Sequence, residues 1–109
     1  MTLRVLFVCS RNRLRSPTAE AVFGGVAGVE TDSAGLAPDA QTVLDAAQVD
    51  WAELIVVMER RHKARLAEKF GALLKGKRVV CVDIPDRYGY MQPELVALLE
   101  RKVGPLLAG

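Results

Sequence analysis

Residues 5–20 read VLFVCSRNRLRSPTAE, and the order of apolar and polar residues in this run sets the expected arrangement of the chain. The apolar part, which ends at Cys9, has the length and β-branched content of a strand covered on both faces. Ser16 suits the N-cap of a following helix and Pro17 its first position, where a missing N–H costs nothing. We therefore predict a buried strand, a polar loop and a helix, with Cys9 and Arg15 at the two ends of the loop.

The loop between this strand and this helix has the chemistry of an anion site. Its backbone N–H groups can curl around one hollow at a helix N-terminus, where free N–H groups and the helix dipole favour negative charge. The same field favours the thiolate form of Cys9 over the thiol. The planar guanidinium of Arg15 can hold two phosphoryl oxygens at once. One loop would then supply a nucleophile, an anion site and an electrophilic group.

The run from Cys9 to Glu20 resembles the signature of the low-molecular-weight protein tyrosine phosphatases. It has their Cys-x5-Arg-Ser, the Asn three residues after the Cys, and the following Pro-x-Ala-Glu. The resemblance implies an α/β three-layer sandwich, with a four-stranded parallel sheet in the order 2-1-3-4 and helices on both faces. It also implies a hydrolase that acts on phosphotyrosine-like phosphate monoesters through a phosphocysteine intermediate, with no cofactor and no metal. The phosphate-binding loop would comprise Ser10, Arg11, Asn12, Arg13, Leu14 and Ser16, and Ser33 would support it by hydrogen bonding toward Asn12.

The rest of the chain alternates between strand-like and helix-like segments, which is typical of a parallel sheet with right-handed crossovers. Strands are expected at residues 4–9, 29–34, 53–58 and 78–83, and helices at 17–27, 42–49, 60–74 and 93–103. The Gly24-Gly25 pair is expected to end the first helix early. In the second helix, Val43, Leu44 and Ala47 are expected to face inward. Ligands bind such sheets beyond the carboxyl ends of the strands.

Transfer of a phosphoryl group to Cys9 requires a proton for the leaving oxygen, which a carboxyl group can give. Residues 84–90 resemble the acid loop of the phosphatase family, and Asp86 aligns with its general acid. Tyr88 aligns with an aromatic residue beside the substrate ring. Arg87 stands where the family usually has Pro, which leaves the loop freer. Asp83 is the competing candidate for the acid.

Composition indicates one globular domain, residues 1–109. A net charge of +2 gives no whole-chain case for binding nucleic acid or a membrane. The two cysteines make no disulfide framework, and a nucleophilic Cys9 must stay reduced, so a cytoplasmic location is expected. No apolar run approaches the length of a signal peptide or a membrane span.

The other reactive side chains are expected to have structural roles. His62 lies at the start of a charged helix, where we expect it to be solvated. Cys81 lies inside an apolar strand, where a buried and inert thiol is usual. No spacing of His, Cys and carboxylates suggests a metal site.

The chain departs from the phosphatase family in its substrate-facing parts. Members are longer between Gly35 and Glu53, where a loop and an extra helix supply an aromatic wall for the phosphotyrosine ring. Arg11 stands where the family has Gly. The expected partner is therefore a phosphorylated protein or a small phosphomonoester, and the sequence does not indicate an oligomeric state. Two alternatives stay open: a thioredoxin-linked arsenate reductase, with Cys81 as resolving thiol, and a non-catalytic module that binds phosphate or a phosphoprotein through Arg11 and Arg13.

Overall fold

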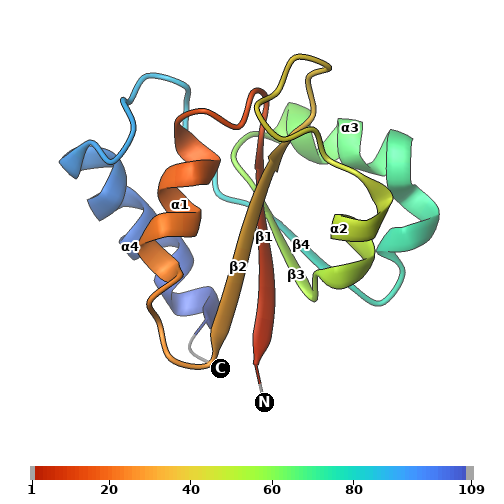
Figure 1. Cartoon of the computed structure of the whole chain (residues 1–109), viewed down its shortest axis with the longest axis horizontal. Coiled ribbons are helices and arrows are strands. Elements are labelled where there is room, and N and C mark those ends of the chain that lie inside the picture. Colours follow the sequence, from red (N-terminus) through yellow and green to blue (C-terminus); the bar gives the residue numbers. More distant parts are fainter. Residues whose placement is uncertain (1, 108–109) are drawn as a thin grey trace.

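Residues 2–107 are described by the computed structural model, in which four parallel strands form one sheet (Figure 1). Along the chain these are β1 (Leu3–Cys9), β2 (Val29–Gly35), β3 (Leu54–Val57) and β4 (Arg78–Cys81). Their order across the sheet is β2-β1-β3-β4, which confirms the predicted α/β fold and strand order. Cys9 lies opposite Gly35 and Val57 lies opposite Cys81, so the carboxyl ends of the strands meet at one edge.

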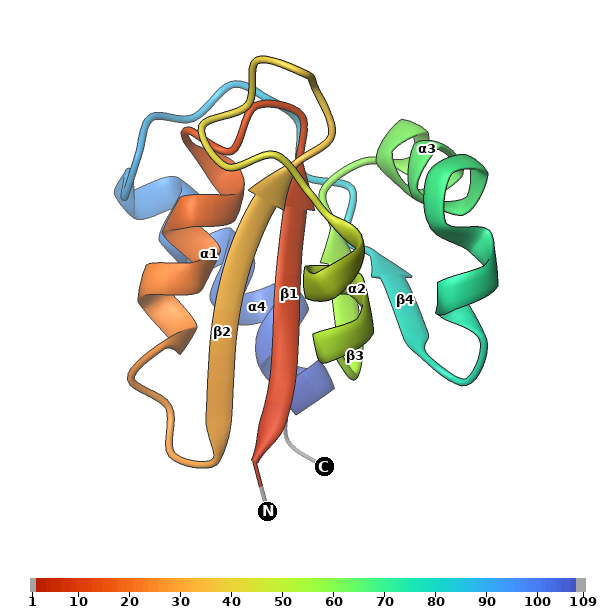
Figure 2. The same ribbon diagram turned by 45° about the vertical axis from the view of Figure 1, so that its right-hand side comes forward.

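Helices cover both faces of the sheet (Figures 1 and 2). They are α1 (Arg15–Phe23), α2 (Ala46–Trp51), α3 (Arg60–Phe70), a 3₁₀ turn η1 (Gly71–Leu74) and α4 (Pro93–Leu107). Side chains alternate along β1, so Val5, Phe7 and Cys9 face α1 and α4. Leu6 and Val8 face α2 and α3. The central strand is thus buried on both sides, which explains its nearly unbroken apolar sequence.

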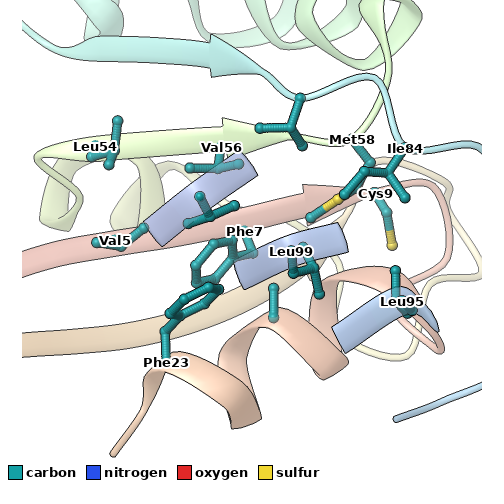
Figure 3. Close-up of a cluster of buried hydrophobic side chains, with 13 residues drawn as sticks. Val5, Phe7, Cys9, Phe23, Leu54, Val56, Met58, Ile84, Leu95 and Leu99 are labelled. Atoms are coloured by element: carbon teal, nitrogen blue, oxygen red, sulfur yellow. The ribbon is translucent and has the colours of Figure 1, made fainter. Parts of the chain in front are cut away.

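Cys9 belongs to the core beneath α1 and α4, which we call the first cluster (Figure 3). The rings of Phe7 and Phe23 stack there with centroids 5.8 Å apart. Each large side chain in the cluster stabilises the fold by about 1.5–3 kcal/mol through burial. The thiol is therefore carried on a buried and closely packed part of the molecule. The first cluster comprises Val5, Phe7, Cys9, Ala19, Phe23, Leu54, Val56, Met58, Val82, Ile84, Leu95, Leu99 and Val103.

The core on the other face, the second cluster, lies beneath α2 and α3. It joins the two central strands to these helices through Val49 of α2 and Leu66 of α3. The half-buried Cys81 packs against it. The second cluster comprises Leu6, Val8, Ala34, Leu36, Leu44, Val49, Ala52, Ile55, Val57 and Leu66.

The start of α1 differs from the prediction. The helix begins at Arg15, and Leu14 occupies the N-cap position without a side-chain capping bond. Ser16 is therefore not the N-cap, because its hydroxyl bonds to Cys9 and Asn12 instead. The end of α1 at Phe23, directly before Gly24, confirms the predicted early stop.

The segment between β2 and β3 also differs from the prediction. The expected helix at 42–49 is α2, which starts only after Asp45, because the Asp45 carboxylate caps it by accepting a hydrogen bond from Gln48 N–H at 2.8 Å. Leu44 is buried as expected, but Val43 and Ala47 are exposed. Val43 forms an isolated bridge with Gly35, which holds the 36–45 loop close to the end of β2.

Candidate active site

A cavity of about 740 Å³ opens at the carboxyl edge of the sheet, between the loop after β1, residues 36–38 and the start of α3. Its walls are strongly basic. Among the described residues, Asp86 is the one carboxylate that lines it. Residues 36–38 (Leu-Ala-Pro) give one part of the wall an apolar character. The arginines that line the cavity are Arg11, Arg13, Arg15, Arg61 and Arg65.

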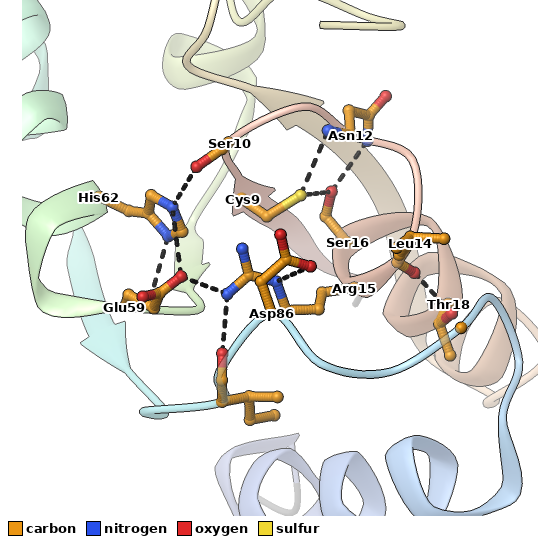
Figure 4. A network of polar contacts seen from close by, with 12 residues as sticks. Cys9, Ser10, Asn12, Leu14, Arg15, Ser16, Thr18, Glu59, His62 and Asp86 are labelled. Atoms are coloured by element: carbon orange, nitrogen blue, oxygen red, sulfur yellow. Dashed lines mark hydrogen bonds and ion pairs between the residues drawn. The ribbon is translucent and has the colours of Figure 1, made fainter.

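The sulfur of Cys9 lies at the base of the loop and takes part in its hydrogen bonding (Figure 4). Sγ accepts from the backbone N–H of Asn12 at 3.3 Å and lies 3.0 Å from the hydroxyl of Ser16. The Asn12 N–H donates to the sulfur, whereas in the contact with Ser16 either atom could be the donor. The loop is therefore folded around the thiol, as an anion-binding loop requires.

Asn12 fixes the shape of the loop. Its backbone has a positive φ of 55°, a left-handed conformation that Asn tolerates better than most residues. Its side-chain amide donates to Ser16 Oγ and to Ser33 Oγ, both at 2.9 Å. Ser33 in turn donates to the carboxylate of Glu20. This chain of bonds ties the loop to β2 and α1, and it brings together the predicted pair Asn12 and Ser33.

Gly35 allows the loop to lie close to the end of β2. A Cβ placed at this position would lie 2.5 Å from the carbonyl oxygen of Ser10 and 2.7 Å from Cβ of Ala40. No side chain fits at either distance. β2 ends at Gly35, as expected. Only a glycine fits there, because the loop after β1 and the loop that contains Ala40 both pass close to its backbone.

Arg15 is only 2% exposed, and its guanidinium is held in place from two sides. Nη1 donates to Glu59 Oε2 at 2.5 Å and to the carbonyl oxygen of Ile84 at 2.8 Å. Nε lies 3.7 Å from Asp86 Oδ1. A buried charge needs such partners, because removal from water costs several kcal/mol per ion. The guanidinium is thus fixed beside the loop before any ligand arrives.

Glu59 was missed by the sequence reasoning, although it closely follows β3 and so lies on the binding edge. Burial acts to raise the pKa of this carboxyl, but hydrogen bonds and charges from Arg61 and Arg15 outweigh it and lower the pKa to about 2. Glu59 is therefore ionised throughout the physiological range. The position of Glu59 shortly after the buried strand β3 was the sequence signal from which its role could have been predicted.

His62 is also different from the prediction, because it is 2% exposed rather than solvated. Nδ1 accepts from the backbone N–H of Glu59 at 3.1 Å, and Nε2 lies 2.9 Å from Ser10 Oγ. Burial, followed by the charges of Arg15 and Arg61, lowers its pKa to about 4. The ring is neutral at pH 7, so Nε2 carries the proton and donates to Ser10. The capping position at the start of α3 turns the ring inward.

The two acid candidates lie in different surroundings. Asp86 lines the cavity, with a side chain 57% exposed and adjacent to Arg15. Asp83 instead accepts from Cys81 Sγ at 3.4 Å and lies 3.9 Å from Arg60, outside the residues that line the cavity. Tyr88 is half-buried against the first cluster and is not among the lining residues either, so its role beside a substrate ring stays a prediction.

Within residues 2–107, no group of three or more His, Cys, Asp or Glu side chains is arranged to hold a metal ion. No helix in that range has the length and apolar character needed to cross a bilayer.

Comparisons with protein-family models and with curated proteins give no match. Solved structures do match. The YwlE arginine phosphatase from Geobacillus stearothermophilus has 25% identity and a TM-score of 0.76, over 95% of this chain and 92% of that chain. Wzb from Vibrio vulnificus, in complex with benzylphosphonate, has 21% identity and a TM-score of 0.79, over 97% of each chain.

A low-molecular-weight protein tyrosine phosphatase from T. tengcongensis has 22% identity and a TM-score of 0.75, over 95% of this chain and 99% of that chain. The chain therefore has the fold of the low-molecular-weight protein tyrosine phosphatases, which are enzymes, and this confirms the resemblance inferred from the sequence. The expected shortening of the 36–52 region relative to that family stays a prediction.

Proposed function

We propose that the chain is a cysteine-dependent phosphatase for phosphate monoesters of the phosphotyrosine type. The observation that carries the proposal is the placement of Cys9 Sγ inside a loop that folds around it, with Arg15 fixed alongside. A phosphoryl group seated in this loop would have three oxygens near hydrogen-bond donors and phosphorus near sulfur. Such a fixed arrangement of donors is the main source of catalysis in phosphoryl transfer.

In the first step, the Cys9 thiolate attacks phosphorus and the bond from phosphorus to the ester oxygen breaks. Protonated Asp86 gives its proton to that oxygen, so the alcohol or phenol leaves neutral. Arg15 and the loop N–H groups stabilise the charge that spreads over the other phosphoryl oxygens. The products of this step are phosphocysteine, the free hydroxyl compound and ionised Asp86.

In the second step, water attacks phosphorus while Asp86 takes a proton from it. The sulfur–phosphorus bond breaks, and the electron pair returns to Cys9 as thiolate. The Ser16 hydroxyl, 3.0 Å from the sulfur, stabilises this leaving thiolate. Inorganic phosphate leaves, and the enzyme regains its starting protonation state.

The substrate class follows from the charge of the cavity. Two structural neighbours are named arginine phosphatases, and phosphoarginine would place a further guanidinium among the five arginines of this cavity. The positive guanidinium of the substrate would be repelled by the like charges of these arginines. An aromatic ring fits better, since it can lie against Leu36, Ala37 and Pro38. We therefore favour aryl phosphates over phosphoarginine.

The test is a phosphate-release assay on phosphotyrosine peptides, aryl phosphates, nucleotides and phosphoarginine, with reduction of arsenate assayed separately. Wild-type protein should release phosphate steadily from the aryl esters. Cys9→Ser should lower kcat by about 10³-fold or more, and Asp86→Asn by about 10²–10⁴-fold. Acid quenching of Asp86→Asn during turnover should yield phosphocysteine, detectable by mass spectrometry. Full activity in Cys9→Ser would refute the mechanism, and tight phosphate binding without turnover would instead select a binding module.

The arsenate reductase alternative requires a second thiol within reach of Cys9. Cys81 lies two strands away, on β4, and packs against the opposite face of the sheet. Two strand spacings amount to about 9.6 Å, and Cα atoms joined by a disulfide lie within about 7 Å. Burial also raises the pKa of the Cys81 thiol, which makes it a poor nucleophile. The arrangement thus favours a phosphatase over a reductase.

A further inference from the structure

The phosphatase chemistry uses one arginine, Arg15, but the cavity has four more. Two of these already have acidic partners: Arg11 lies 3.8 Å from Asp39, and Arg61 lies 3.1 Å from Glu59. Within the described part of the chain, Arg13 and Arg65 make no ion pair. Charged side chains without partners at a cavity mouth are available to a ligand.

These cations come from two separate elements. Arg13 lies on the loop after β1, whereas Arg61 and Arg65 lie on α3. We call Arg13 and Arg65, the two lining arginines without an ion pair, the arginine rim. Because one member lies on the loop after β1 and the other on α3, the rim suits anionic groups that are themselves spread along a ligand.

The apolar part of the wall narrows the choice of ligand further. Leu36, Ala37 and Pro38 carry no charge, so a ligand that is anionic on all sides would match only part of the cavity. A peptide with an aromatic phosphorylated residue and carboxylates beside it would match both parts. Its ring would contact the apolar wall and its flanking Asp or Glu side chains would reach the rim.

We propose that the arginine rim is a specificity site for acidic side chains that flank the phosphorylated residue of a protein substrate. This inference deepens the proposed phosphatase function and depends on it for its kinetic readout. Arginine is suited to the task because its fork binds carboxylates with two parallel hydrogen bonds. The contacts are exposed and screened by salt, so they adjust substrate choice rather than drive the chemistry.

The experiment compares three phosphotyrosine peptides that differ only in their flanks, which are acidic, amide-bearing or basic. Binding is measured by fluorescence anisotropy with the Cys9→Ser protein, and kcat/KM is measured with the wild type. We expect the acidic peptide to be preferred over the amide peptide by roughly tenfold at low ionic strength, mainly through KM. Added salt should reduce this preference.

Arg65→Gln is the test variant. It should reduce severalfold the ratio of kcat/KM for the acidic peptide to kcat/KM for the amide peptide. Lys63→Gln is the matched control, because Lys63 lies exposed on the same helix but does not line the cavity. It removes the same charge and should leave the ratio unchanged. Equal binding of the three peptides by Cys9→Ser, or an equal effect of both variants, would overturn the proposal.

Other outcomes separate this proposal from the proposed function. If aryl phosphates are hydrolysed but the residues that flank the phosphotyrosine change neither binding nor kcat/KM, the proposed phosphatase function stands and the rim proposal fails. If nothing is hydrolysed but Cys9→Ser binds the acidic peptide through Arg65, the rim proposal stands and the phosphatase fails. If an oligonucleotide competes through Arg65 while acidic peptides show no preference, the rim binds nucleic acid and the proposal is wrong.

Discussion

His62 Nε2 lies 2.9 Å from Ser10 Oγ, so a buried imidazole of α3 is bonded to the residue that directly follows Cys9. The other ring nitrogen accepts from the N–H of Glu59, the residue whose carboxylate holds Arg15. One neutral ring therefore connects the two functional parts of the site, the loop and the guanidinium. Protonation of this ring at Nδ1 would abolish the hydrogen bond that Nδ1 accepts from the N–H of Glu59. It would also place a third positive charge beside Arg15 and Arg61.

The stability of the fold should fall between pH 6.5 and pH 4.5 because of His62. The pKa of this ring is about 4 in the folded protein and 6.5 when exposed, so in this range the unfolded chain binds more protons. Its contribution, at most about 3 kcal/mol, is complete above pH 6.5 and is lost as pH falls toward the folded pKa. Thermal unfolding followed by circular dichroism across this range measures it.

His62→Gln provides the comparison, since His62 is the one histidine of the chain. The variant should be less stable at pH 7 by about 1–3 kcal/mol, yet its stability should change less between pH 6.5 and 4.5. Titration of the single imidazole by NMR should give a pKa near 4. The same pH dependence in both proteins would contradict the assignment.

Glu59→Gln should reduce both stability and turnover. The change leaves the buried guanidinium of Arg15 without its closest anion, which should cost about 1–3 kcal/mol. A looser Arg15 should lower kcat/KM for aryl phosphates by roughly tenfold or more, as misplaced catalytic groups do. Asp83→Asn removes a carboxylate near the same edge but outside the cavity, and it should leave kcat/KM unchanged. Equal effects of the two substitutions would argue against a positioning role for Glu59.

Gly35→Ala should disrupt the loop, because the added Cβ would lie 2.5 Å from the backbone oxygen of Ser10. Neither this backbone nor Ala40 can yield without moving a loop, so we expect a loss of about 1–3 kcal/mol and a strong fall in kcat. Gly71→Ala is the control, since nothing lies within 4 Å of a Cβ at that position. Denaturant unfolding and phosphate release measure the two effects. A fully active Gly35→Ala would show that the loop shape is not required.

Asn12→Ala and Asn12→Gly separate backbone conformation from side-chain bonding. Both lose the hydrogen bonds to Ser16 and Ser33, but Gly accepts the φ of 55° without strain. Ala should therefore be the less stable variant by about 1 kcal/mol. Both should lose activity, because the loop is no longer tied to β2. If Asn12→Gly kept full activity, the side-chain bonds would have no role in holding the loop.

The strands and the loop were predictable because they follow from local pattern and from one geometric rule, whereas the order of the strands was implied by the family resemblance. Apolar runs of strand length give the sheet, and the meeting of strand ends places Cys9 and Asp86 at one edge. The rest depends on tertiary contacts that no local pattern carries. Ser16 looks like a helix cap, but its hydroxyl is used by Cys9. His62 stands among charged residues, yet its bonds to Glu59 and Ser10 bury it.

The two thiols lie on opposite faces of the sheet, and this separation bears on how the protein responds to peroxide. Oxidation of the Cys9 thiolate by hydrogen peroxide would give a sulfenic acid and hydroxide, which takes up a proton to become water. Because Cys81 is out of reach, that sulfenic acid has no internal thiol with which to condense. Recovery would require a thiol from solution, such as glutathione, which forms a mixed disulfide and releases water before a second thiol restores Cys9. Prolonged exposure without such a thiol should instead lead to the sulfinic acid and lasting inactivation, which intact-mass measurement would detect.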